Sequence, residues 1–185
     1  MKKLRVAVTT EAVLLLLGLA LPSMAVDLDV GASAPDFTLK DWSTAETEHT
    51  LSGLKGQVVV LQFGSSTAWE YVKNVEALEN LQKKYKGKGV QVFTVYTREA
   101  AGNWQGTSDF DRSERAKGLR FAYGLQTHKR MLVPVLIDDL QDSTFKAYGQ
   151  APEAVFVVDR EGKIAFKSAK PNVAEVGKAL QKLIE

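Results

Sequence analysis

The chain has 185 residues, enough for one domain with a full hydrophobic core, and its 45% hydrophobic and 25% charged content is that of an ordinary globular protein. Its formal net charge of +2 excludes the strongly basic composition of proteins that bind nucleic acid by general electrostatic attraction. The absence of cysteine excludes disulfides and zinc–thiolate sites, so stability must come from burial of the core.

The N-terminal segment has the three-part pattern of a secretory signal peptide. Three basic residues lie within the first five positions, residues 12–21 form an apolar run, and Pro22 ends it. Ser23 and Ala25 place small residues three and one positions before a cleavage site. Because the apolar run is too short to span a bilayer, it predicts a signal that is removed after Ala25; a retained N-terminal anchor is the alternative.

Cleavage there would divide the chain into a signal peptide at residues 1–25 and a single mature domain at residues 26–185. The mature domain would carry 21 basic and 21 acidic residues and therefore no net charge. We expect a periplasmic or secreted protein that binds no nucleic acid and has no stable membrane insertion after signal cleavage.

The first elements of the mature domain are strands and turns. Residues 34–39 alternate between apolar and polar side chains, which predicts a brief edge strand. Residues 42–50 are polar and predict a loop, and residues 51–56 predict a turn. Residues 58–63 form a run that is rich in valine and apolar except for Gln62, which predicts a strand buried on both faces.

From about residue 70 to residue 86 the apolar period changes to that of a helix, and Gly87 and Gly89 end it. Three lysines near its C-terminus complement the helix dipole. The lysine-rich run at residues 83–88 could bind nucleic acid or lipid, but the neutral total charge favours a solvated helix end. The apolar face consists of Val72, Val75, Leu78, Leu81 and Tyr85.

The second half of the domain continues the alternation of strands and helices. Residues 90–96 predict a strand, residues 102–108 a loop, and residues 109–124 a weaker helix. Residues 133–137 predict a short strand, and residues 142–148 one or two helical turns.

The C-terminal part predicts a hairpin and a closing helix. Residues 154–158 and 163–167 are apolar runs joined by a turn that ends in Gly162. The last helix follows Pro171, with Asn172 and Glu175 as a capping box.

The order of these elements predicts an α/β fold. Strands that alternate with helices imply a central sheet with helices on both faces, and the closing hairpin makes that sheet mixed. No repeat, linker or low-complexity segment interrupts the chain, so we expect one domain.

This layout resembles the thioredoxin-like fold, in the redoxin branch that includes peroxiredoxin-like (AhpC/TSA) and TlpA-like proteins. The similarity covers nearly all of residues 30–185. The segments that carry it are Gly31–Leu39, Val133–Asp138, Ala147–Gly149 and Pro152–Ile164.

A narrower resemblance is to the iodothyronine-deiodinase-like group of that branch. It rests on Phe63–Thr67 followed by a helix, on Val95–Ala100 and on Trp104.

The resemblance implies a redox site whose reactive groups this chain lacks. The family's reactive cysteine or selenocysteine corresponds to Ala68, and its two-thiol spacing ends at Tyr71. A second cysteine of the deiodinase-like group corresponds to Ser66, and a commonly present histidine corresponds to Ala101. In the family the nucleophile lies at a helix N-terminus, where backbone N–H groups lower the pKa of a thiol. Here that electropositive end would remain, with no sulfur to activate.

Two interpretations of the neighbouring hydroxyls are open. Ser66 or Thr67 could act as a nucleophile if His49 or His128 served as its base. The alternative, which we favour, is that Ser66 and Thr67 cap the following helix.

A binding groove could persist without the sulfur. The resemblance implies that Pro152 is a cis-proline opposite the active loop, whose backbone holds an extended substrate segment. Trp69, Glu70 and Trp104 would line the same groove, and aromatic side chains suit the binding of peptides or flat ligands. For two of the three aromatic residues Trp69, Tyr71 and Trp104, packing in the core or at the rim is the alternative.

Neither a cofactor nor a metal site is expected. With no cysteine and two separated histidines, a zinc site is not indicated. Asp138, Asp139 and Asp142 could hold a hard cation, although we interpret them as a solvated turn.

The leading hypothesis is an exported redoxin-like protein that has lost thiol chemistry, a pseudoenzyme that binds a peptide, protein or small molecule in the former active-site groove. The alternatives are an oxidoreductase that borrows a thiol from a partner or bound cofactor, a hydrolase built on Ser66 or Thr67, and an active protein silenced by a deliberate change to Ala68.

Overall fold

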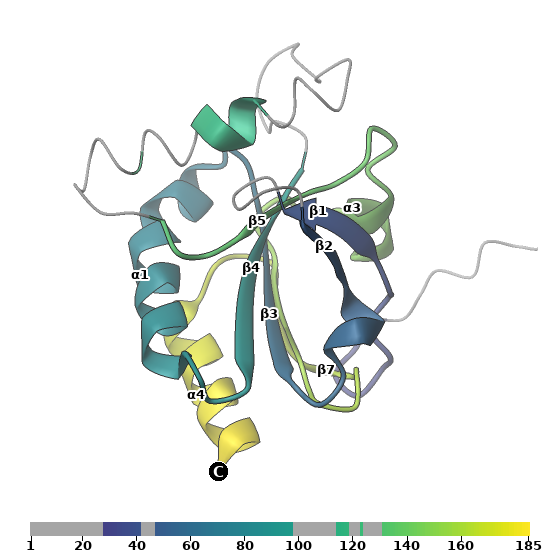
Figure 1. Ribbon diagram of the computed structural model, residues 1–185, viewed down its shortest axis with the longest axis vertical. Helices are drawn as coiled ribbons and strands as arrows, with labels where there is room; N and C mark the ends of the chain where they lie inside the picture. Colours follow the sequence, from purple (N-terminus) through teal and green to yellow (C-terminus); the bar gives the residue numbers. More distant parts are fainter. Residues whose placement is uncertain (1–27, 42–46, 98–113, 119–122, 124–130) are drawn as a thin grey trace, which may run out of the picture.

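The computed structural model describes residues 28–41, 47–97, 114–118, 123 and 131–185 (Figure 1). The predicted signal peptide, the 102–108 loop, Ala101, Trp104 and His128 lie outside the described residues. Within the described part, no helix is both long and apolar enough to cross a membrane.

Seven strands of the described residues form one mixed sheet in the order β2-β1-β5-β4-β3-β6-β7 (Figure 1). The strands are β1 (Thr38–Asp41), β2 (Thr47–Thr50), β3 (Val58–Gly64), β4 (Val90–Tyr96), β5 (Val135–Ile137), β6 (Val155–Val158) and β7 (Ile164–Ser168).

The helices are α1 (Trp69–Tyr85), α3 (Ser143–Ala147), α4 (Val173–Ile184) and the 3₁₀ helix η1 (Leu51–Leu54). Residues 114–118 are also helical. This order confirms the predicted α/β class, and the elements of residues 58–96 lie within one or two positions of their expected bounds.

The central strand β3 organises the sheet. It runs parallel to β4 and antiparallel to β6, and all seven of its residues are buried. A strand that is covered on both faces tolerates a continuous apolar run, which is why β3 does not alternate.

Helices cover both faces of the sheet and divide the core into two layers. On one face, side chains of α1 and α4 such as Leu78 and Leu180 pack on Val60 and Val92. On the other face, Phe145 of α3 packs among Leu61 and Phe93. In Figure 1, α1 and α4 lie on one side of the strands and α3 on the other.

The predicted edge strand at residues 34–39 is wrong in its bounds and in its place at the edge of the sheet. The strand is β1, it begins at Thr38, and it lies between β2 and β5. The true edge is β2, within the segment expected to be a loop. Its four residues, Thr-Glu-His-Thr, are polar and half-buried or exposed, so they show no apolar pattern.

Three turns and caps predicted from the sequence are present in the structure. Gly162 closes the β6–β7 hairpin with φ +85°. The Asn172 side chain accepts a hydrogen bond from Glu175 N at 3.2 Å at the start of α4. Gly87 and Gly89, with φ +76° and +71°, turn the chain from α1 into β4.

Candidate functional site

The site predicted by the resemblance lies where β3 ends and α1 begins. Ala68 is the N-cap residue of α1, and its exposed fraction is 2%. Its amide donates to Ser65 O at 3.2 Å, and its carbonyl accepts the first helical hydrogen bond from Val72 N at 3.0 Å. A buried methyl group therefore occupies the position of the expected nucleophile.

The rim of this position is open to solvent. Ser66 and Thr67 are exposed, and Trp69 has an exposed fraction of 66%. The Lys73 ammonium lies 5.1 Å from the centre of the Trp69 ring and 3.2 Å from the Glu70 carboxylate. A large aromatic ring beside paired charges is a surface on which a partner could dock.

The expectation that Ser66 or Thr67 caps α1 stays a prediction, since the N-cap residue itself is Ala68. The Ala68 side chain makes no hydrogen bond to the first turn, and the Thr67 hydroxyl lies 3.4 Å from the Ser65 hydroxyl. Because alanine has no acceptor, an acceptor for the N–H groups of the first turn must come from another residue.

Glu153 supplies one such acceptor. Its Oε1 accepts a hydrogen bond from Glu70 N at 2.8 Å, so a carboxylate from the segment before β6 caps the helix across 83 positions of sequence. No local pattern in the sequence singles out Glu153 for this role. The antiparallel pairing of Gln62 with Val155 brings the start of β6 beside the end of β3, and this pairing could have revealed it.

Gln62 fixes the segment that carries Glu153. Its side chain is fully buried, and its Nε2 donates to Glu153 O at 2.9 Å, Phe63 O at 2.8 Å and Ala154 O at 3.2 Å. By the alternation of β3, Gln62 lies on the α1 face with Val58 and Val60. A neutral amide at this place can hold a backbone in position but cannot accept a proton.

Tyr71 occupies the position of the second expected thiol and belongs to the core. It is completely buried, and its hydroxyl lies 3.2 Å from Thr94 Oγ1. Burial raises the pKa of Tyr71 above its usual value, so the phenol stays neutral. Gly64 makes room for its ring, because a Cβ there would lie 2.4 Å from Tyr71 Cγ.

The predicted cis-proline is wrong. No described peptide bond is cis, so the Ala151–Pro152 bond is trans. Ala154 N donates to Ala151 O at 3.1 Å, and the resulting turn leads into β6 with Pro152 exposed and Glu153 half-buried. This turn presents the Glu153 carboxylate to Glu70 N of α1.

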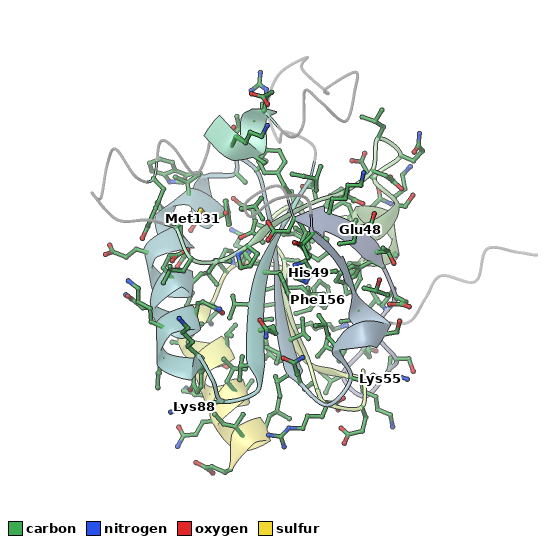
Figure 2. All side chains as sticks on the ribbon, viewed as in Figure 1. Glu48, His49, Lys55, Lys88, Met131 and Phe156 are labelled. Carbon is green, nitrogen blue, oxygen red and sulfur yellow. The ribbon has the colours of Figure 1, made fainter. Side chains whose placement is uncertain are left out.

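His49 lies away from the candidate hydroxyls. Its ring centre is 4.9 Å from that of Phe93, in the core layer on the α3 face, and its Nε2 is 3.9 Å from Asp41 Oδ2. In Figure 2 the labelled His49 lies over the strands and not beside α1. The structure therefore brings His49 to β2 and Asp41, not to Ser66 or Thr67.

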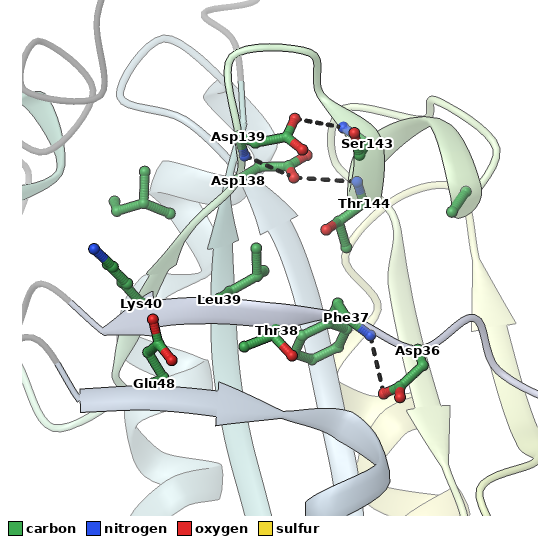
Figure 3. A pocket seen from close by; sticks show the side chains of 12 residues that line it. Asp36, Phe37, Thr38, Leu39, Lys40, Glu48, Asp138, Asp139, Ser143 and Thr144 are labelled. Carbon is green, nitrogen blue, oxygen red and sulfur yellow. Dashed lines mark hydrogen bonds between the residues drawn. The ribbon is translucent and has the colours of Figure 1, made fainter.

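The interpretation of the acidic cluster as a solvated turn is wrong for Asp138 and Asp142, whereas Asp139 is exposed as expected. Asp138 and Asp142 have exposed fractions of 1% and 0%. Asp138 accepts a hydrogen bond from Thr144 N at 3.1 Å (Figure 3) and another from Phe145 N at 2.8 Å, so it is tied to α3. Burial raises the pKa of Asp138 although these hydrogen bonds oppose the shift.

A pocket of about 460 Å³ adjoins Asp138 between β1, β2 and α3, on the face of the sheet opposite α1 (Figure 3). Among the described residues, no group of three or more His, Cys, Asp or Glu side chains could hold a metal ion. The pocket is lined by Asp36, Phe37, Thr38, Leu39, Lys40, Glu48, Ile137, Asp138, Asp139, Ser143, Thr144 and Ala147.

Comparison with known proteins agrees with this architecture. The chain is 29% identical over 139 residues to the thiol-disulfide oxidoreductase ResA of Bacillus thuringiensis, covering 74% of this chain and 68% of that protein. It is 27% identical over 136 residues to ResA of Geobacillus kaustophilus, covering 73% and 66%.

Solved structures share the fold at lower identity. The thioredoxin domain of a thiol-disulfide oxidoreductase from Bacteroides vulgatus superposes with a TM-score of 0.63 at 18% identity, covering 85% of this chain and 99% of that one. The exposed lipoprotein thioredoxin of Streptococcus pneumoniae superposes with a TM-score of 0.61 at 20% identity, covering 80% and 100%.

These matches establish a thioredoxin-like fold. The Redoxin family model matches residues 29–183, which is most of the chain. The chain therefore belongs to the Redoxin family, in which it stands as a member without cysteine.

Proposed function

We propose that this protein is an exported, non-catalytic redoxin that binds an extended peptide at the surface around Ala68, Trp69 and Pro152. The observation that carries the proposal is the buried methyl group of Ala68 at the N-terminus of α1. Thiol–disulfide exchange begins with attack by a thiolate, and the chain contains no sulfur atom that could become one.

The other reactive position supports the same conclusion. Tyr71 is committed to the core through its contact with Gly64 and the approach of its hydroxyl to Thr94. Besides Ser66 and Thr67, the Trp69 ring and Pro152 are exposed at the site. Such a surface suits a segment of partner chain that lies across the N-terminus of α1.

The proposal also covers the place of this protein within its family and its location in the cell. The resemblance of Phe63–Thr67 to the iodothyronine-deiodinase-like group supports a place beside that group within the family. The pattern of residues 1–25 supports export. N-terminal sequencing of protein recovered from the periplasm or medium of the source cells should find Val26 first; a sequence that starts at Met1 would contradict cleavage.

The first experiment tests the absence of chemistry. Purified mature protein is assayed for reduction of insulin disulfides, reduction of hydrogen peroxide and deiodination of an iodothyronine, with dithiothreitol as reductant. We expect the rates of the protein-free control. Turnover that depends on the amount of protein would overturn the proposal, and its loss on Ser66→Ala or Thr67→Val would favour a hydroxyl nucleophile.

The second experiment tests binding. The probe is reduced, carboxymethylated α-lactalbumin, a permanently unfolded polypeptide, and its affinity is followed by fluorescence anisotropy. Trp69→Ala should weaken binding by about tenfold, since exposed aromatic anchors dominate such interfaces. Val30→Ala is the matched control, because Val30 is 62% exposed and lies beside β7. Equal effects of the two substitutions, or no binding by the wild type, would contradict this site.

A further inference from the structure

Glu153 binds the N-terminus of α1 next to Ala68, the position at which the proposed function expects no chemistry. We infer that its carboxylate has taken over the electropositive N-terminus of α1 and is the residue that prevents an anion from being stabilised at position 68. The inference rests on the proposed function, because it explains why sulfur alone would not restore the site. Glu153 is a positioning residue in this argument, since it acts through the backbone of α1.

The geometry of the first turn leads to this inference. An N-cap side chain normally accepts from the backbone N–H of the second or third helical residue. With Ala68 as N-cap, the second helical residue is Glu70, whose N–H donates to Glu153 Oε1 at 2.8 Å. A sulfur atom at position 68 would therefore meet a donor that is already engaged and a negative charge already in place.

The carboxylate is held there by more than its own hydrogen bond. Gln62 binds the carbonyl oxygens of Glu153 and of Ala154, and Ala154 N closes the turn back to Ala151. Phe63 N donates in turn to Ala154 O at 2.9 Å. These contacts fix the backbone on both sides of the Glu153 side chain, so the cap is part of the fold and not a chance surface contact.

The Glu153 carboxylate should reverse the effect that the helix N-terminus has on the pKa of a thiol at position 68. Free N–H groups and the dipole of α1 favour a thiolate and lower its pKa, whereas an adjacent carboxylate disfavours a second negative charge and raises it. Burial at position 68 raises the pKa of a thiol further. An introduced sulfur should therefore behave as an ordinary or a weakly acidic thiol, not as an activated one.

The test introduces a thiol into a chain that has none of its own. The variants are A68C, A68C/E153Q and A68C/E153A, and the pKa of the thiol is read from the Cβ chemical shift of ¹³C-labelled cysteine. We expect A68C to titrate at or above about 8.5, the value of an unperturbed cysteine. The E153Q variant removes the charge, and the E153A variant also frees the Glu70 N–H. We expect the pKa to fall in that order, with a total decrease of roughly one unit.

The matched control is A68C/E70Q, which removes a neighbouring carboxylate that pairs with Lys73 and does not cap the helix. Its effect on the thiol should be less than half that of E153A. Equal pKa values in A68C and A68C/E153A, or a pKa well below that of free cysteine in A68C itself, would overturn the inference.

A measurement on the wild-type protein guards against loss of folding in the variants. Amide hydrogen exchange of Glu70 should be slowed at least tenfold relative to Trp69, because N–H groups of a first turn without a cap exchange freely. Rapid exchange at Glu70 would contradict the cap. These outcomes are separate from the assays of the wild type for turnover and peptide binding, so the inference and the proposed function can fail independently.

Discussion

Gly64 fixes how closely α1 approaches β3. A Cβ at this position would lie 2.4 Å from Tyr71 Cγ and 2.7 Å from two further carbons of the ring, and the rigid ring is packed in the core. The glycine is therefore required by the space that Tyr71 fills, and not by an unusual backbone angle.

Gly64→Ala should lower the free energy of unfolding by about 3 kcal/mol, because neither backbone nor ring can yield without strain. Urea denaturation followed by circular dichroism measures the change. Gly53→Ala is the control, since the nearest atom to its new Cβ would be Thr50 Cβ at 3.9 Å. A G64A protein as stable as G53A would show that the ring can move aside.

Asp138 should make the free energy of unfolding depend on pH in a direction that can be predicted. Burial raises the pKa of Asp138 in the native state above 3.8, its ordinary value, which applies in the unfolded state. At a pH between the unfolded-state pKa and the native-state pKa, Asp138 is therefore protonated in the native state and ionised in the unfolded state. The unfolded state binds fewer protons there, and the free energy of unfolding contributed by Asp138 falls as pH rises through that interval.

The test compares the wild type with Asp138→Asn between pH 3 and pH 7 by urea denaturation. As pH rises above about 4, the wild type should lose stability relative to the variant, which does not titrate.

Asp36→Asn should show the opposite dependence of stability on pH. Burial opposes the shift, but hydrogen bonds from Ser52 and Phe37 and the charge of Lys55 hold the pKa of Asp36 below 3.8. Wild type should therefore lose stability relative to D36N only as pH falls below about 3.8. A difference between wild type and D138N that is constant with pH would contradict the assignment.

At the scale of elements, Glu79 ties α1 to the segment that leads into β5. It is buried, with 1% of its surface exposed, and its two carboxylate oxygens accept from Leu132 N at 2.7 Å and Val133 N at 2.9 Å. The carboxylate therefore takes the place of a strand partner for these two backbone donors.

Glu79→Ala should therefore cost about 2–4 kcal/mol of stability, because it leaves two donors without an acceptor in the protein. Asn80→Ala, at the exposed neighbouring position, should change stability by less than about 0.5 kcal/mol. Thermal denaturation of both variants measures the difference. Equal melting temperatures for the two would mean that water replaces the carboxylate at no cost.

The elements also show what a sequence can reveal. Strands β3 and β4 and helix α1 were predicted nearly to the residue, because their burial imposes a strong period on the apolar side chains. Strand β2 was missed because an edge strand of polar residues has no such period; it pairs with β1 through backbone groups and through the Thr38 and Thr50 hydroxyls, 2.8 Å apart.

The candidate site was predicted only as far as local sequence determines it. The place of Ala68 at the start of α1 follows from the end of one apolar run and the beginning of a helical period. The cap from Glu153 depends on the pairing of β3 with β6, which is a long-range contact that no local pattern encodes. The burial of Asp138 likewise depends on the docking of α3 against the sheet.

At the scale of the whole molecule, one sheet serves two core layers. Val60 faces α1 and α4, whereas the next residue, Leu61, faces α3 and the aromatic group of Phe63, Phe156 and Tyr148. Both residues are fully buried on the same strand. A loss of packing on either face therefore weakens β3, on which the other face also depends.

This shared strand predicts that the two layers unfold together. Leu61→Ala should lower the free energy of unfolding by about 2–5 kcal/mol through the cavity it leaves on the α3 face. The urea midpoint followed by circular dichroism at 222 nm, which is dominated by α1 and α4, should shift as much as the midpoint followed by the NMR signals of the Phe145 and Tyr148 rings, which pack on the α3 face. Coincident transitions are the mark of a single cooperative unit. If the α1 face kept its midpoint while the α3 face lost stability, the two layers would be independent, because β3 would then hold one face without the other.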